Sequence, residues 1–312
     1  MVRKIIALLL GTAVTLAAAG CGSRQNGAAD GKVTISVSFN ALYELSAAVG
    51  GDKVAISVII PDGTEPHDFE PRARDLAMLK DADIFVVNGL GMEDWADDAV
   101  KAAGNTDIRV VDASSGVEAI SIEEHEEVQT GVHEGENEAE HEHGAYDPHI
   151  WLSPLCAVTM AGNIRDALVH TDPANSAYYD ANYKSFTDAL ETLHAQYAEK
   201  LKNADNKSFV TGHAAFAYLC RDFGLVQNSV EDVFAEGEPG AQQLAALVGY
   251  CRENHITTIF TEALVSAAVS ETLAREVGAS VKPIYTMASA ENGKSYLDRM
   301  EENLSVIYES LK

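Results

Sequence analysis

The chain has 312 residues, of which 48 are acidic and 22 basic, so its formal net charge at neutral pH is −26. A chain this acidic argues against nucleic acid as a partner, because neutralising phosphates takes a basic surface. With 46% apolar and 22% charged residues, the composition is that of a folded globular protein. The length allows one large domain or two of ordinary size.

Residues 1–20 have the features of a secretory signal peptide. Arg3 and Lys4 precede an apolar run, and small residues follow directly before Cys21. The run is too short for a lasting transmembrane helix. Its ending resembles a bacterial lipobox, so we expect a signal peptide over 1–20, a lipid on Cys21 and a flexible tether over 21–31. The protein would then be extracytoplasmic and anchored to the cell membrane by its lipid.

From residue 33 onward, strand-like and helix-like segments alternate. Short β-rich runs occur at 33–39, 54–60, 84–89 and 108–113, with helical stretches around 42–49, 72–79 and 94–102. The same alternation returns after residue 206, and it ends in a helix from about residue 292. Such βαβ units predict mainly parallel sheets. We therefore expect two α/β lobes, over 32–172 and 206–312.

A long helix is predicted between the lobes, within residues 173–205. This stretch has no internal Gly or Pro, and its apolar residues recur at spacings of three and four. A helix of about 30 residues would be roughly 45 Å long at 1.5 Å per residue. It could brace the two lobes as a rigid strut, although an ordinary packing helix would have the same periodicity.

Three histidines lie in turn-rich segments next to predicted strands. His67 follows one strand, His213 ends another, and His149 lies in the segment YDPHIWLSP. Ligands of open α/β sheets collect beyond the carboxyl ends of the strands. Three neutral imidazoles suit a borderline-soft cation such as Zn²⁺. A structural role is the alternative for any one of the three taken alone.

Four segments, in this order, carry a resemblance to a known family: PDGTEPHDFEP, DPHIWLSP, TGHAAFAYLCRDFGL and IFTEALVSAAVSETLAREVGA. They are similar to segments of the metal-binding solute-binding proteins of bacterial ABC importers for zinc and manganese. The resemblance covers about residues 33–312. It implies two (β/α) lobes joined by one long rigid helix, with the metal in the cleft between the lobes. It also implies a permease and its ATPase subunit as partners, and we expect a monomer.

Carried over by position, the resemblance makes His67 and His149 ligands from the N-terminal lobe and His213 a ligand from the C-terminal lobe. The chain departs from the family at the fourth ligand, because Met287 and Ala288 stand about where many relatives have a carboxylate. Glu262, Glu291, a water molecule or a histidine of the acidic run described next remain alternatives. In the family, a histidine at the third position accompanies zinc and a glutamate accompanies manganese. The resemblance therefore implies Zn²⁺ as the transported ligand, with Mn²⁺ as the alternative.

Residues 123–143 form an acidic run that contains nine Glu and four His, namely His125, His133, His141 and His143. The run has no apolar periodicity, so we expect a loop on the rim of the cleft. It could bind zinc weakly and concentrate cations near the site, or it could be a solvated insertion. Zinc-specific relatives often carry such a loop.

Two other function classes are compatible with parts of the sequence. A secreted zinc hydrolase also uses three histidines and an open position, but the chain has no HExxH motif and no GxSxG motif. We therefore expect no enzymatic activity. A surface adhesin is the other alternative.

Cys156, Cys220 and Cys251 form no CxxC pair, and we expect free thiols, with a Cys220–Cys251 bridge as the alternative.

Overall fold

The computed structural model describes residues 31–122, 145–235, 239–291 and 293–312. The N-terminal sheet has the strand order β2-β1-β3-β4 and the C-terminal sheet the order β6-β5-β7-β8, and all strand pairs are parallel. The strands of the first sheet are β1 (Val33–Val37), β2 (Val54–Val58), β3 (Ile84–Val87) and β4 (Arg109–Asp112). Those of the second are β5 (Ser208–Thr211), β6 (Val226–Ser229), β7 (Thr258–Thr261) and β8 (Ser280–Pro283).

Eight α-helices in the described residues connect and cover these sheets. They are α1 (Asn40–Gly50), α2 (Ala96–Ala103), α4 (Pro154–Thr171), α5 (Ser176–Lys202), α6 (Ala217–Phe223), α7 (Ala241–Glu253), α8 (Ala267–Val277) and α9 (Tyr296–Ser310). The prediction of two parallel α/β lobes is confirmed. The domain limits 32–172, 173–205 and 206–312 stay predictions.

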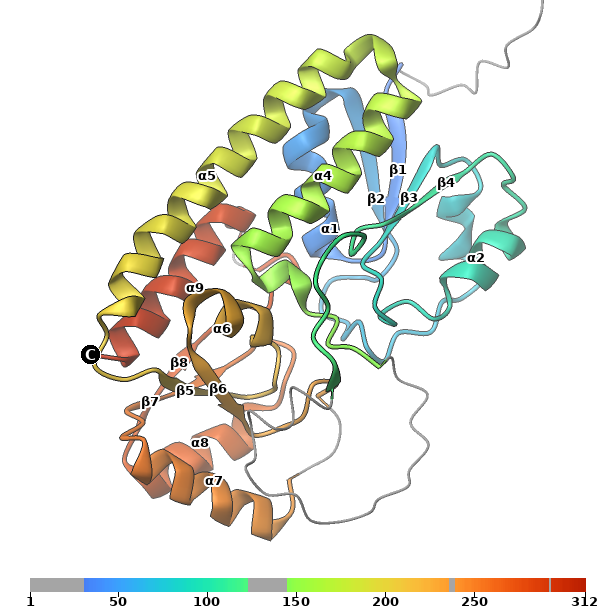
Figure 1. The fold of residues 1–312 in the computed structure, drawn as a ribbon. Coiled ribbons are helices and arrows are strands. Elements are labelled where there is room, and N and C mark those ends of the chain that lie inside the picture. Colours follow the sequence, from blue (N-terminus) through green and yellow to red (C-terminus); the bar gives the residue numbers. More distant parts are fainter. Residues whose placement is uncertain (1–30, 123–144, 236–238, 292) are drawn as a thin grey trace, which may run out of the picture.

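Helix α5 runs along both lobes, from the N-terminal sheet to the C-terminal sheet (Figure 1). At 27 residues it is about 40 Å long. One face of α5 is buried along its whole length, from Tyr179 through Leu190 to Leu201, against α1, α4, α6 and α9. The predicted periodicity therefore corresponds to real packing on elements of both lobes.

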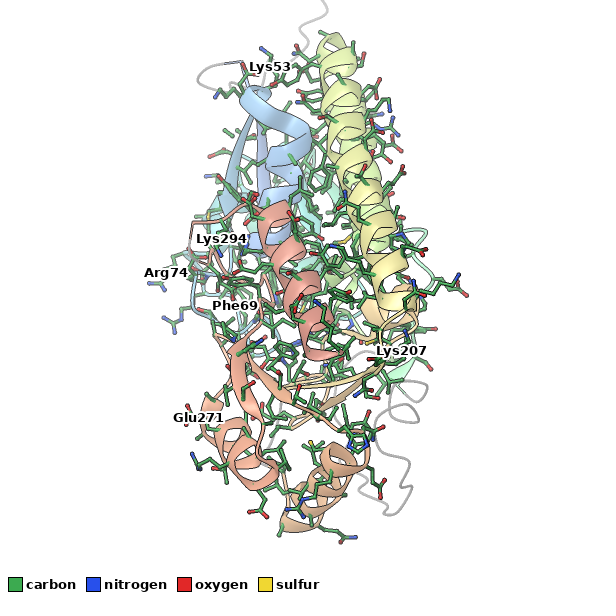
Figure 2. All side chains as sticks on the ribbon, turned by 90° about the vertical axis from the view of Figure 1, so that its left-hand side faces the viewer. Lys53, Phe69, Arg74, Lys207, Glu271 and Lys294 are labelled. Atoms are coloured by element: carbon green, nitrogen blue, oxygen red, sulfur yellow. The ribbon has the colours of Figure 1, made fainter. Side chains whose placement is uncertain are left out.

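Helix α9 lies beside α5 and also contacts α1 of the N-terminal lobe. Figure 2 shows α5 and α9 side by side on the face toward the viewer, between Lys53 near one end of the molecule and Glu271 of α8 near the other. The C-terminal segment thus packs against both lobes. Together, α5 and α9 contact helices of both lobes.

The helix expected around residues 72–79 is not present, which corrects that expectation. The segment forms turns that end in a short 3-10 helix, Leu76–Leu79. Most backbone hydrogen bonds of the segment span three residues, as from Asp75 to Arg72 (2.8 Å) and from Lys80 to Ala77 (3.3 Å), which is the pattern of 3-10 turns rather than of an α-helix.

Candidate metal centre

Three histidines from three loops meet between the two lobes. His67 lies in the loop after β2, His149 immediately precedes the 3-10 turn Ile150–Leu152, and His213 follows β5. Nε2 of His149 lies 3.1 Å from Nε2 of His67 and 3.4 Å from Nε2 of His213. One ligand atom of each ring lies within 4.8 Å of those of the other two. The structure thus brings together all three histidines that the sequence indicated.

The topology of the two sheets explains this position. In each sheet the second strand is added on one side of the first strand, and the third and fourth strands are added on its other side. The order of the strands therefore reverses between β1 and β3 in the first sheet and between β5 and β7 in the second. Ligand sites in open α/β sheets form at such switch points, beyond the carboxyl ends of the strands. The carboxyl ends of the two sheets face each other between the lobes (Figure 1). Loops from both switch points therefore reach the same place.

His149 is held by a buried carboxylate. One oxygen of Asp147 accepts from the backbone N–H of His149 (2.8 Å) and lies 2.9 Å from its ring Nδ1. Asp147 is fully buried and His149 is 1% exposed. The side chain of Asn88, which follows β3, donates to the carbonyl of Pro148 (2.9 Å) and fixes the same loop to the N-terminal sheet.

His213 has a carboxylate in a comparable position. Oε1 of Glu262 accepts from the backbone N–H groups of Gly212 (3.2 Å) and His213 (3.3 Å), and it lies 3.7 Å from Nδ1 of His213. A Cβ on Gly212 would lie 2.0 Å from Oε2 of Glu262, so only glycine leaves room for this carboxylate. Burial lowers the pKa of His213, but nearby carboxylates, Glu262 first, outweigh that effect and raise the pKa above its ordinary value.

His67 has its nearest carboxylate on the other side of the ring. Oε1 of Glu65 lies 3.9 Å from Nε2 of His67, the nitrogen that faces the other histidines. Burial raises the pKa of Glu65, although the nearby His213 lowers it in part. The ring of Phe234 packs edge-on against His67 at 5.7 Å between centroids. Glu65 thus lies on the side of the His67 ring where the three imidazoles converge.

The two glutamates predicted as candidate fourth ligands lie outside this group of three among the described residues. Glu262 lies behind His213, as described above. Glu291 lies 3.7 Å from the guanidinium of the buried Arg299, and burial raises its pKa to about 7. Met287 and Ala288 lie in a loop whose carbonyls contact Asn40 of α1. The identity of the fourth ligand therefore stays a prediction.

Sequence reasoning missed Asp147 and Glu65 next to these histidines. A signal was present, because each carboxylate stands two residues before its histidine with a proline between, in EPH and in DPH. The pattern indicates a nearby carboxylate, but it does not say which ring nitrogen the carboxylate faces. In the structure Asp147 faces Nδ1 of His149, whereas Glu65 faces Nε2 of His67.

The remaining sequence predictions have separate outcomes. Cys156, Cys220 and Cys251 are buried free thiols, as expected. Cys21 and the four histidines of the acidic run, His125, His133, His141 and His143, lie outside the described residues. In the described part of the chain, no helix is both long and apolar enough to span a bilayer.

Two parallel α/β lobes joined by a long helix, with imidazoles from both lobes converging between them, define a two-lobed solute-binding protein of the metal-binding class. Residues 35–310 match the family described as zinc-uptake complex component A, periplasmic (ZnuA). The chain belongs to this family.

Its similarity to individual members extends over nearly the whole chain. A putative metal-binding protein of Treponema pallidum is 42% identical over 89% of this chain and 86% of its own length. The high-affinity zinc uptake system protein ZnuA of Bacillus subtilis is 36% identical over 100% of this chain and 99% of its own length. The solved structure of the laminin-binding protein Lmb of Streptococcus agalactiae, described as a bifunctional protein with adhesin and metal transporting activity, is 31% identical. It covers 90% of this chain and 100% of its own, with a TM-score of 0.78.

Proposed function

We propose that the protein is the extracytoplasmic zinc-binding component of an ABC importer. The observation that carries this proposal is the spacing of the converging nitrogens. Two nitrogens that are each about 2.05 Å from one tetrahedral zinc ion lie about 3.3 Å apart. The Nε2 atoms of His67 and His213 lie 3.1 and 3.4 Å from that of His149. His67, His149 and His213 are the proposed ligands.

Zinc fits these donors better than manganese does. Three imidazole nitrogens form a borderline-soft donor set, whereas Mn²⁺ prefers oxygen ligands. Glu65 extends the candidates for the fourth position, beside Glu262, Glu291 and water, because it lies on the Nε2 side of His67. An imidazole must be neutral to bind, so we expect zinc affinity to fall as the histidines become protonated.

We propose that zinc is captured outside the cytoplasm, buried between the lobes and passed to a membrane permease that an ATPase drives. Membership of a zinc-uptake family supports this role. The signal peptide over 1–20, the lipid on Cys21 and a monomeric state are further parts of the proposal, which rest on the sequence. Delivery without chemical change of a substrate distinguishes this role from that of a zinc hydrolase.

For the acidic run over 123–143, we propose auxiliary zinc capture. The isolated bridge between Ser121 and Tyr146 brings the two flanks of the run together, one residue before Asp147. The described flanks of the run thus lie close together and next to the histidine site. Deletion of residues 123–143 should leave the tight site intact and lower the number of weakly bound zinc ions or the rate of capture. Unchanged stoichiometry and unchanged uptake at scarce zinc would contradict this role.

A second candidate function, surface adhesion, is favoured by the likeness to Lmb. It is compatible with zinc binding, since one lipid-anchored protein could perform both tasks. Binding of the purified protein to immobilised laminin would test it, and no binding above that of an unrelated acidic protein would remove this candidate.

The zinc proposal is tested by titrating the purified mature protein with Zn²⁺ and with Mn²⁺ in competition with a chelator. We expect one tight zinc site and much weaker manganese binding. Replacing His67, His149 or His213 by Ala should each weaken zinc binding sharply, whereas His170→Ala on α4 should not. A His213→Ala protein with full affinity would contradict the assignment.

A further inference from the structure

Two histidines of the proposed zinc site share one local arrangement, although they come from different lobes. In each case a single carboxylate oxygen accepts from the backbone N–H of the histidine and faces Nδ1 of the same ring. For Asp147 and His149 these distances are 2.8 and 2.9 Å. For Glu262 and His213 they are 3.3 and 3.7 Å, the second being a charge contact that is longer than a hydrogen bond. Asp147 precedes its histidine by two residues, whereas Glu262 follows a different strand, β7.

The arrangement determines which ring nitrogen carries the proton. An ionised carboxylate only accepts hydrogen bonds, and a neutral imidazole has one donor nitrogen and one acceptor nitrogen. A carboxylate that faces Nδ1 therefore favours the proton on Nδ1 and leaves a lone pair on Nε2. In both rings Nε2 is the nitrogen that points to the other histidines.

The consequence for this pair of rings is electrostatic. With Nδ1 protonated in both rings, two lone pairs face each other across the 3.4 Å between Nε2 of His149 and Nε2 of His213. This contact is not a hydrogen bond in that tautomeric state, since neither nitrogen has a proton to donate. Both rings are buried, so water has little access to this pair of nitrogens. A cation between the two nitrogens would relieve the repulsion of their lone pairs.

We propose that Asp147 and Glu262 are positioning residues that set both imidazoles as Nε2 acceptors and thereby preorganise the site for a divalent cation. This inference rests on the proposed zinc function and deepens it. Carboxylates behind metal-bound histidines fix the tautomer and the ring orientation, and they raise the basicity of the ligand nitrogen. The proposal also gives Glu262 a role other than that of fourth ligand.

His67 differs from this pattern in an informative way. Its nearby carboxylate, Glu65, lies on the Nε2 side of the ring, at 3.9 Å. Glu65 therefore cannot select the Nε2 lone pair as Asp147 and Glu262 do. We expect Asp147 and Glu262 to control the tautomers of His149 and His213, and Glu65 to have no such effect on His67.

The experiment combines zinc affinity with the tautomer of the zinc-free protein. Imidazole nitrogens are observed by long-range ¹H–¹⁵N NMR correlation, well above the ordinary histidine pKa, in the wild type and in Asp147→Ala and Glu262→Ala. The wild type should show protonated Nδ1 in both rings, and each Ala variant should lose that preference in its own histidine. Each Ala variant should also weaken zinc binding by roughly 10–100-fold.

Conservative variants separate the hydrogen bond from the charge. In Asp147→Asn the amide oxygen can still accept from the backbone N–H and from Nδ1, and in Glu262→Gln it can still accept from the backbone N–H and face Nδ1, so the tautomer should be kept. Zinc affinity should then fall by less than in the Ala variants, because only the negative charge is lost. If an Ala variant does not fold, as judged by circular dichroism, its Asn or Gln counterpart must still bind zinc more weakly than the wild type.

The matched control is Asp83→Asn. Asp83 also accepts from a backbone N–H, that of Thr34 (2.8 Å). It lies at the amino end of β3, whereas the histidines lie beyond the carboxyl ends of the strands. Asp83→Asn should keep wild-type affinity and tautomers. Wild-type affinity in the Ala variants, or protonated Nε2 in both rings of the wild type, would overturn the inference. A wild type that binds no zinc would instead refute the proposed function, and the tautomers would still decide this inference.

Discussion

Two carboxylates that stand at the same position relative to a histidine in the sequence face different nitrogens of the histidine ring in the structure. Glu65 and Asp147 each precede a histidine by two residues, with a proline between. Asp147 is fully buried and faces Nδ1 of His149, whereas Glu65 is partly exposed and faces Nε2 of His67. Both carboxylates accept from the backbone N–H of their own histidine, so the two cases differ in the ring nitrogen that faces the acid. Identical spacing thus gives one proposed positioning residue and one candidate ligand.

Because Gly212 has no Cβ, there is room beside it for the carboxylate of Glu262. We expect Gly212→Ala to weaken zinc binding at least tenfold, because the new Cβ would lie 2.0 Å from Oε2 of Glu262 and displace the carboxylate from His213. Gly212→Ala should also lower the midpoint temperature of thermal unfolding. Chelator competition and a thermal melt measure the two effects.

Gly249→Ala is the control for Gly212→Ala. Gly249 lies within α7 and has open space around its Cβ position. Alanine there should raise the free energy of unfolding by roughly 0.5–1 kcal/mol and leave zinc affinity unchanged. The double change Gly212→Ala with Glu262→Ala should be more stable than Gly212→Ala alone, since the clash is gone. Wild-type zinc affinity in Gly212→Ala would contradict the explanation.

Helix α9 is attached to the N-terminal lobe through a buried guanidinium. Arg299 of α9 is fully buried; it forms an ion pair with Glu44 of α1 and donates to the carbonyl of Ser289 (2.9 Å). Burial lowers the pKa of Arg299 to about 10. The side chain of Asn40 donates to the same carbonyl at 3.1 Å. These contacts join α1, α9 and the loop after β8 into one unit.

We expect Arg299→Met to lower the free energy of unfolding by about 3 kcal/mol, because it leaves the partly buried Glu44 and the buried Glu291 without their partner. Urea unfolding of the zinc-free protein measures this change. The control is Lys184→Ala on α5, which breaks an exposed ion pair with Asp188 and should change stability by less than about 1 kcal/mol. Equal stability of Arg299→Met and the wild type would show that the buried pair does not join the helices energetically.

At the scale of the molecule, much of the architecture could be predicted from the sequence because it depends on local periodicity. The β-rich runs became parallel strands, and the spacing on 173–205 became one continuous helix, α5. The helix predicted around 72–79 is instead a run of turns with a short 3-10 helix, since most of its backbone bonds span three residues. The sequence named Glu262 as a candidate ligand, but its place behind His213 depends on the pairing of neighbouring strands and could not be predicted.

Several buried acids give the whole protein a pH-dependent stability. Burial raises the pKa of Glu93 to about 7, although it accepts hydrogen bonds from Ser38, Asn88 and Gly89. Burial also raises the pKa of Glu291 to about 7. In the unfolded chain both groups lose their protons near the ordinary value of 4.5. Between these two values the folded protein binds more protons than the unfolded chain, so stability falls as pH rises. The raised pKa of His213 acts in the same direction, since its contribution is present at low pH and lost as pH rises through its folded pKa.

We therefore expect the zinc-free protein to melt at a lower temperature at about pH 8 than at about pH 5.5. Thermal melts across this window should show a smaller decrease in Glu93→Gln, which cannot titrate. Asp298→Asn is the control: the pKa of this exposed residue at the start of α9 is lowered from its ordinary 3.8, so its contribution changes only at more acidic pH. Saturating zinc should oppose the decrease, because it binds the folded state and requires neutral imidazoles. A melting temperature of the zinc-free protein that rises from pH 5.5 to 8 would mean that these buried acids are ionised throughout.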